Sequence, residues 1–206
     1  MRESNYLWLL DAGHGGIKKD GTYTTAPAKM KTFDDGLTIY EGVINRAIAD
    51  FVYLQLEQKQ IDFTLVYDDV EDTPLSQRVS IADNVYRKDK RAVYVSIHSN
   101  AGGGSGFEIF TSPGQTKSDK IANLFCETYQ KLFPRVPFRK DVADGDADKE
   151  ADFYVLRKSD CPALLVENLF FDNRKEAEYL LSETGQREIA MCIVQSIMAC
   201  ETLKPI

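Results

Sequence analysis

The sequence LWLLDAGHGG at residues 7–16 joins a short apolar run to a glycine-rich turn. Four successive apolar residues at 7–10 are typical of a strand that is buried on both faces. The polar and glycine residues that follow them are typical of a tight turn. We therefore predict that the first strand is buried and ends in a turn that carries His14.

A helix is expected after a long connection. Residues 15–39 are polar and rich in Lys, Thr and Asp, and connections of this length between a strand and a helix are often functional. From Glu41 to about Lys59, apolar residues recur with the 3.6-residue period of an amphipathic helix that packs on a sheet. The apolar positions are Val43, Ile44, Ala47, Ile48, Phe51 and Val52.

Strands and helices alternate along the rest of the chain. Further strands are predicted at 63–67, 92–97, 106–111 and 163–166, and further helices at 74–85, 117–133 and 189–198. Residues 134–152 are polar and are expected to be irregular. This alternation is typical of an α/β three-layer sandwich, in which a mostly parallel, twisted sheet of about six strands has helices on both faces.

Composition narrows the class of protein. The 206 residues are 43% hydrophobic and 28% charged, which supplies a core and excludes global disorder, and we expect a single domain over residues 1–206. The apolar runs are far shorter than the ~20 residues that cross a bilayer. With 25 basic and 32 acidic side chains the net charge is −7, and basic residues are dense only at 87–91, which argues against a nucleic-acid partner.

The two histidines of the chain each follow a predicted strand: His14 follows residues 7–10, and His98 follows residues 92–97. A single histidine is more often structural than functional. The carboxyl ends of parallel strands, however, meet at one edge of the sheet, where ligands bind. Two histidines at equivalent strand ends therefore indicate a functional site.

Two glutamates are expected at the same edge. Catalytic zinc takes three protein ligands and keeps one position for water. Glu41 opens the first helix and is a candidate third ligand, although its position is equally explained by attraction to the helix dipole. Glu167 follows the strand at 163–166, where a partly desolvated carboxyl group can exchange protons near neutral pH; capping of the following turn is the alternative.

Four ordered motifs resemble the zinc-dependent N-acetylmuramoyl-L-alanine amidases of the type-3 amidase family. They are DAGHGG at 11–16, Glu41, SIHSNA at 96–101, and LVE at 165–167 with Asn173 downstream. The resemblance spans most of the chain. It implies three zinc ligands and one catalytic glutamate, which are His14, Glu41, His98 and Glu167.

Two positions depart from the family's pattern. Ala12 stands where the family commonly has Pro, and Asn-Leu-Phe at 168–170 replaces Leu-Gly-Phe. Neither departure removes a ligand or the catalytic glutamate. We expect them to affect the turn that carries Glu167 and the lining of the substrate groove, and so substrate preference more than reaction type.

The resemblance implies hydrolysis of the amide between the lactyl group of N-acetylmuramic acid and the L-alanine of the stem peptide. Zn²⁺ polarises the carbonyl group and acidifies a water molecule, and Glu167 carries a proton from this water to the leaving amine. Asp11 and Asn100 are expected to orient the ligands, although both residue types also favour turns. Peptidoglycan is the expected partner of a monomeric enzyme that binds neither nucleic acid nor membrane.

Two rival functions remain. A zinc carboxypeptidase acting on stem peptides uses similar ligands, but its short H-x-x-E unit is missing because Ile17 occupies the glutamate position. A non-catalytic peptidoglycan-binding module with a decayed site is the other alternative, and retention of all four candidate residues argues against it.

The first residues lead straight into the first predicted strand, without an apolar leader segment. We therefore expect cytoplasmic synthesis, followed by action on the cell wall after release, as in a lysin, or by secretion if a leader was removed. The four cysteines contain no C-x-x-C pair, and we expect them to be reduced and mostly buried.

Overall fold

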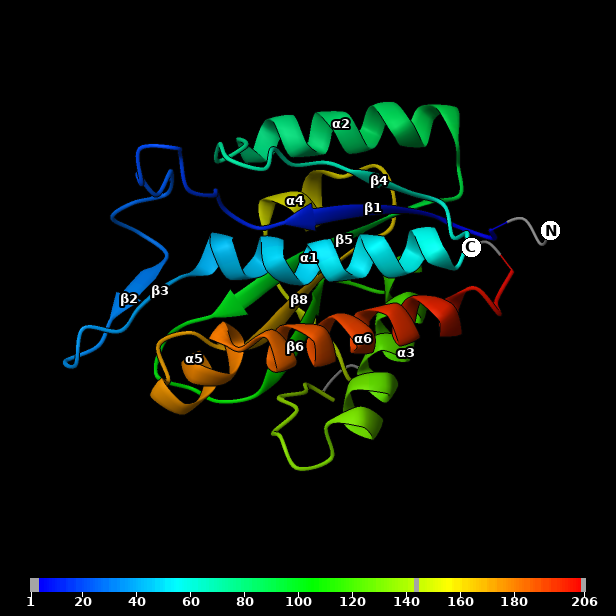
Figure 1. Ribbon diagram of the computed structural model, residues 1–206. Helices are drawn as coiled ribbons and strands as arrows, with labels where there is room; N and C mark the ends of the chain where they lie inside the picture. Colours follow the sequence, from blue (N-terminus) through cyan, green and yellow to red (C-terminus); the bar gives the residue numbers. More distant parts are fainter. Residues whose placement is uncertain (1–3, 143–144, 205–206) are drawn as a thin grey trace.

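The computed structural model describes residues 4–142 and 145–204; the first residues, on which the expectation about a leader segment rests, lie partly outside this range. A six-stranded sheet of order β4-β1-β5-β8-β6-β7 forms the centre of the fold (Figure 1). Strands β4, β1, β5 and β8 are parallel, whereas β6 runs antiparallel to β8. The strands are β1 (Leu7–Ala12), β4 (Phe63–Leu65), β5 (Ala92–Asn100), β6 (Phe107–Thr111), β7 (Lys149–Glu150) and β8 (Ala163–Phe170).

Helices cover both faces of the sheet, which confirms the predicted three-layer sandwich (Figure 1). One face carries α1, α3 and α6, and the other carries α2 and α4, while α5 packs against β8 and α6. The helices are α1 (Glu41–Gln58), α2 (Leu75–Lys88), α3 (Lys117–Leu132), α4 (Tyr154–Lys158), α5 (Arg174–Leu181) and α6 (Glu183–Cys200). Among the described residues, no helix is both long and apolar enough to cross a bilayer.

Strand β1 shows why residues 7–10 are continuously apolar. Trp8 and Leu10 belong to the core beneath α1, α3 and α6, whereas Leu9 packs in the core beneath α2 and α4. All three side chains are fully buried. Because successive side chains of a strand point to opposite faces, a sheet covered on both sides needs apolar residues at every position.

The structure corrects the predicted ends of two strands. Strand β5 continues through His98 to Asn100, and β8 continues through Glu167 to Phe170, so both candidate residues lie within strands and not after them. His98 and Glu167 are direct partners in the parallel pairing of these strands. The pairing of the two strands extends beyond the predicted apolar runs into residues with polar side chains.

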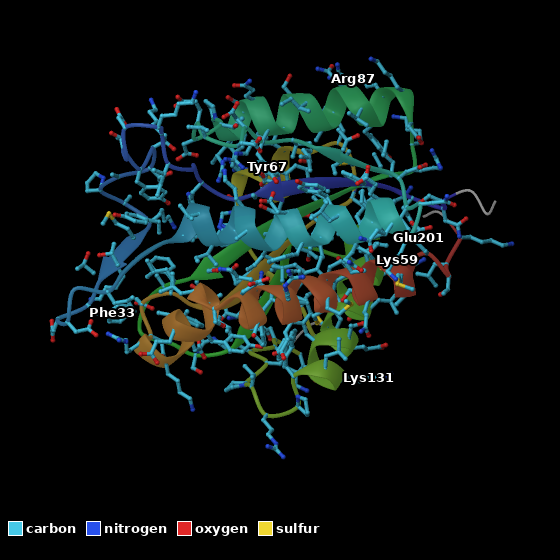
Figure 2. The ribbon with its side chains drawn as sticks, viewed as in Figure 1. Phe33, Lys59, Tyr67, Arg87, Lys131 and Glu201 are labelled. Carbon is cyan, nitrogen blue, oxygen red and sulfur yellow. The ribbon has the colours of Figure 1, made fainter. Side chains whose placement is uncertain are left out.

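The long connection after β1 contains structure that the sequence analysis did not predict. Strands β2 (Met30–Thr32) and β3 (Thr38–Tyr40) pair as an antiparallel hairpin. This hairpin projects from the body of the protein, with Phe33 near its outer part (Figure 2). Helices α4 and α5 and strand β7 were also not predicted. All of these elements are short, and too few residues are available to show a periodic pattern.

Candidate metal centre

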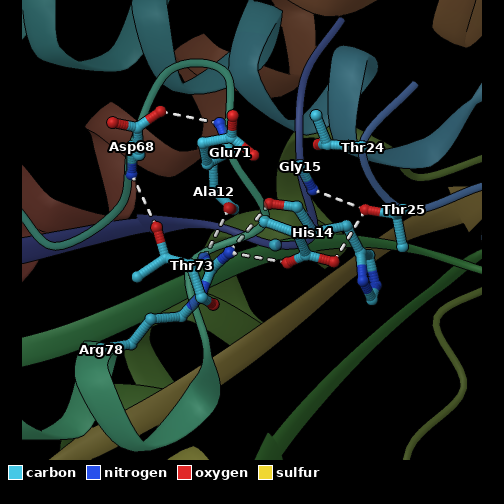
Figure 3. A network of polar contacts seen from close by, with 12 residues as sticks. Ala12, His14, Gly15, Thr24, Thr25, Asp68, Glu71, Thr73 and Arg78 are labelled. Carbon is cyan, nitrogen blue, oxygen red and sulfur yellow. Dashed lines mark hydrogen bonds and ion pairs between the residues drawn. The ribbon is translucent and has the colours of Figure 1, made fainter. Parts of the chain in front are cut away.

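Two buried arginines stabilise the backbone of the turn that carries His14. Nη2 of Arg78 and Nη2 of Arg46 donate hydrogen bonds to the carbonyl oxygen of His14, at 2.8 and 2.9 Å. Arg78 also donates to the carbonyl oxygens of Ala12 and Thr73, and lies beside the turn in Figure 3. His14 itself has φ of 66°, a conformation uncommon for a residue with a side chain. The arginines therefore hold an otherwise unfavourable turn in place.

Glu41 brings the two histidines together. It is the first residue of α1, and its side chain is 1% exposed. Its Oε1 atom lies 3.0 Å from Nδ1 of His98 and 3.2 Å from Nε2 of His14. The two imidazole rings meet edge to face, with their centroids 4.9 Å apart. The structure thus unites the three residues that the resemblance assigns as zinc ligands.

The arrangement of these three side chains fits a metal ion. One ligand atom from each of His14, Glu41 and His98 lies within 4.8 Å of the others. Two of the atoms at the centre, Nε2 of His14 and Oε2 of Glu41, are buried and have no hydrogen-bond partner. Burial disfavours the charged form of Glu41, but its close contacts with the two imidazoles and their attraction hold its pKa well below the usual range. An ionised carboxylate and two imidazoles are suitable ligands for a divalent cation.

Glu167 lies next to this group on β8. Together with His14 and His98 it lines a cavity of about 410 Å³. Its Oε2 atom is buried without a hydrogen-bond partner. Burial raises the pKa of Glu167 to about 7; the charge of His98 opposes this shift and that of Glu41 adds to it. A carboxyl group of this kind can both accept and release a proton near neutral pH.

The remaining two predicted site residues, Asp11 and Asn100, contact residues that surround the proposed ligands. Asp11 accepts a hydrogen bond from Ser96 at 2.6 Å and pairs with Arg78, which in turn holds the His14 turn. Asn100 donates to Oε2 of Glu108 at 3.2 Å, on strand β6, which lies beyond β8 in the sheet. These contacts of Asp11 and Asn100 therefore stabilise the surrounding strands and the His14 turn.

The sequence analysis missed Asn45. Its Nδ2 atom donates to the carbonyl oxygen of Gly13 at 3.2 Å and to Oε1 of Glu41 at 3.4 Å. Asn45 is fully buried one helical turn after Glu41. The spacing of four residues places both side chains on one face of α1, and this signal could have identified Asn45 as a residue that positions Glu41.

The departure from the family's pattern after Glu167 places a leucine in a backbone conformation that favours glycine. Leu169 occupies the position where the family usually has Gly and has φ of 62°. That conformation favours glycine, yet here a buried leucine adopts it. Asn173, further along, caps α5 and donates to the carbonyl oxygen of Gly104 at 3.1 Å.

Comparison with known proteins agrees with this geometry. Residues 9–199 match the family Amidase_3, described as N-acetylmuramoyl-L-alanine amidase. The chain is 31% identical over 183 residues to N-acetylmuramoyl-L-alanine amidase CwlM of Bacillus licheniformis, covering 88% of this chain and 63% of that protein. It is 30% identical over 202 residues to the endolysin of Bacillus phage SPP1, covering 98% of this chain and 68% of the endolysin. The chain thus spans about two thirds of the length of these relatives.

A solved structure is similar over nearly its whole length. The catalytic domain of CwlV, an N-acetylmuramoyl-L-alanine amidase from Bacillus (Paenibacillus) polymyxa var. colistinus, superimposes with a TM-score of 0.74 at 27% identity. The match covers 97% of this chain and 99% of that domain. On the family match, the relatives and this shared fold, the chain belongs to the Amidase_3 family of N-acetylmuramoyl-L-alanine amidases.

Proposed function

We propose that this protein is a zinc-dependent amidase that hydrolyses the bond between the lactyl group of N-acetylmuramic acid and the L-alanine of the stem peptide. The observation that carries the proposal is the convergence of His14, Glu41 and His98 beside Glu167. Family membership supports the reaction type. The names of the relatives, an amidase and a phage endolysin, support peptidoglycan as the substrate.

Zinc is the metal that this site would hold, through His14, Glu41 and His98. Nitrogen ligands from two imidazoles and one carboxylate oxygen suit Zn²⁺ better than the oxygen-binding ions Mg²⁺ and Ca²⁺. When bound, zinc polarises a carbonyl group and lowers the pKa of a water molecule.

Glu167 is the proton carrier in this proposal. It accepts a proton from the attacking water and delivers it to the nitrogen of the leaving L-alanine, so that the C–N bond breaks as a neutral amine departs. Its position opposite His98 in the sheet places it beside the proposed ligands. A pKa of about 7 suits both halves of this task.

The wider arrangement follows from the same proposal. The chain forms one catalytic domain over residues 1–206 and acts as a monomer on peptidoglycan. Asp11 and Asn100 support the site through the contacts with Arg78 and Glu108. The net charge of −7 argues against a nucleic-acid substrate.

Digestion of purified peptidoglycan tests the function. We expect new amino-terminal alanine in proportion to the cleavage, without new reducing sugar ends or released terminal amino acids. Reducing ends would indicate a glycosidase, and released terminal amino acids would indicate a carboxypeptidase. Sedimentation of the protein with the wall without any product would indicate a binding module, and each of these three results would overturn the proposal.

A further inference from the structure

We propose that Lys29 contacts the substrate: its ammonium group donates a hydrogen bond to the carbonyl oxygen of the scissile amide and stabilises the negative charge that develops there. This inference rests on the proposed amide hydrolysis and adds a residue to it. In amide hydrolysis, water adds to the carbonyl carbon and the oxygen gains negative charge. A donor held in place before the reaction lowers the barrier for that step.

The ammonium group lies at the edge of the metal centre. Nζ of Lys29 is 3.9 Å from Oε2 of Glu41, and Lys29 lines the same cavity as His14, His98 and Glu167. A separation of 3.9 Å is longer than a hydrogen bond, so the ion pair leaves the donors of the ammonium free for a ligand. The side chain is 47% exposed, which places it at the mouth of the cavity, where substrate can reach it.

Two basic side chains, Lys29 and Arg78, line this cavity among the described residues, and of these Lys29 has free donors. The side chain of Arg78 is 1% exposed. Its guanidinium already binds Asp11 and the backbone of the His14 turn, so it has no free face toward a substrate. Lys29 is therefore the basic residue that is available to stabilise a negative charge developing in the cavity.

The backbone at Lys29 is held in an unfavourable conformation. Lys29 has φ of 58°, in the left-handed region that residues with side chains rarely adopt. Its carbonyl oxygen accepts hydrogen bonds from the backbone N–H of Glu41 at 2.9 Å and from the hydroxyl of Tyr23 at 3.2 Å. One of these partners is itself a proposed metal ligand. The position of Lys29 is thus tied to the metal centre through both backbone and side chain, and strained residues of this kind cluster at active sites.

The hairpin that follows Lys29 is also anchored. Arg174 of α5 pairs with Asp35 at 2.6 Å, and its guanidinium lies 5.2 Å from the ring centroid of Phe33. These contacts join the outer part of the β2–β3 hairpin to α5. Lys29, at the base of the hairpin, is therefore held from both sides.

Lys29 and Glu167 lie beside different members of the proposed ligand set. Glu167 is the sheet partner of His98, whereas Lys29 approaches through Glu41. This arrangement lets one group move the proton while the other stabilises charge on the substrate oxygen.

Kinetics of Lys29→Met on a soluble muramyl peptide test the inference. We expect kcat to fall about 100- to 1,000-fold, as on removal of one donor to a developing oxyanion, with KM changed by less than about threefold. Zinc content, measured by atomic absorption, should stay at the wild-type level, and Lys29→Arg should recover part of the rate. Lys31→Met is the matched control, because Lys31 is an exposed residue of the same hairpin; its kinetics should be unchanged.

Several results would overturn the inference. These are wild-type kcat in Lys29→Met, a loss that disappears at saturating zinc, or a rise in KM alone. The second result would show that Lys29 only supports Glu41, and the third that it only binds the ground state. If Lys29→Met does not fold, Lys29→Gly removes the same side chain and suits the backbone conformation. A wild-type protein that releases no amino-terminal alanine would instead refute the proposed function, and the inference with it.

Discussion

Gly13 lies directly against the imidazole ring of His98: a Cβ atom at Gly13 would fall 2.1 Å from Cε1 and 2.3 Å from Nε2 of that ring. The end of β1 and the ligand-bearing part of β5 therefore approach so closely that only glycine fits between them. The Gly of the DAGHGG turn provides room for His98, a proposed ligand 85 residues further along the chain. This contact links a turn motif to the geometry of the metal centre.

Gly13→Ala should displace His98 and weaken metal binding. The added methyl group overlaps the ring, and overpacking of this kind destabilises a protein by about 1–3 kcal/mol. We expect zinc affinity, measured by competition with a chromophoric chelator, to fall by about tenfold or more. Gly114→Ala is the control: Gly114 has φ of 90° and open space around its Cα, so alanine there adds strain without touching the site. Equal zinc affinity in wild type and Gly13→Ala would contradict the prediction.

Glu167→Gln should abolish turnover while zinc content persists. Glutamine keeps the size of the side chain but cannot accept and return a proton, and general acid–base catalysis typically contributes about 10²- to 10⁴-fold. The rate on purified peptidoglycan and the zinc content of the same sample provide the measurement. Glu57→Gln, at an exposed position near the end of α1, should behave as wild type. Substantial residual hydrolysis in Glu167→Gln would remove Glu167 from this role.

Removal of the metal should be reversible in the wild type. Treatment with a chelator should reduce hydrolysis to background, and added Zn²⁺ should restore it. Zinc should also raise the melting temperature, because a ligand at 100 times its Kd stabilises the folded state by about 2.7 kcal/mol. His14→Ala should show neither effect, since it lacks one of the three ligands. Stoichiometric zinc in purified His14→Ala would show that the proposed ligand set is wrong.

Asp148, outside the metal centre, should make stability depend on pH. Burial, together with the neighbouring Asp146, raises the pKa of Asp148 to about 7, although a hydrogen bond from Thr111 at 2.7 Å opposes the shift. Between the ordinary value of 3.8 and about 7, the folded state retains a proton that the unfolded state releases. The free energy of unfolding should therefore decrease as pH rises through this window and level off above about pH 7.

Asp148→Asn should remove this dependence, because its amide stays neutral at every pH. We expect the variant to be more stable than wild type by about 1–2 kcal/mol at pH 8, with a smaller gain at pH 5. Urea unfolding of both proteins at the two pH values measures the difference directly. A difference that does not change between pH 5 and pH 8 would contradict the raised pKa.

Much of the fold was predictable because both faces of the sheet are covered. Apolar runs such as residues 7–10 and 92–97 identify strands without any knowledge of their neighbours, and the period after Glu41 identifies a helix. Their order implies the layers, since parallel strands need crossover helices. The polar continuation of β5 and β8 through His98 and Glu167 was not predictable in the same way, because it depends on pairing between two strands.

The order and type of four residues in the sequence therefore determined the candidate site, which consists of His14, Glu41, His98 and Glu167. Only the tertiary structure showed the part played by residues that carry no motif. Lys29 lies in an irregular connection, and its path depends on hydrogen bonds to Glu41 and Tyr23 and not on a local pattern. A periodic sequence encodes which face of an element is buried, whereas the direction of a side chain in a loop is decided by its partners elsewhere in the fold.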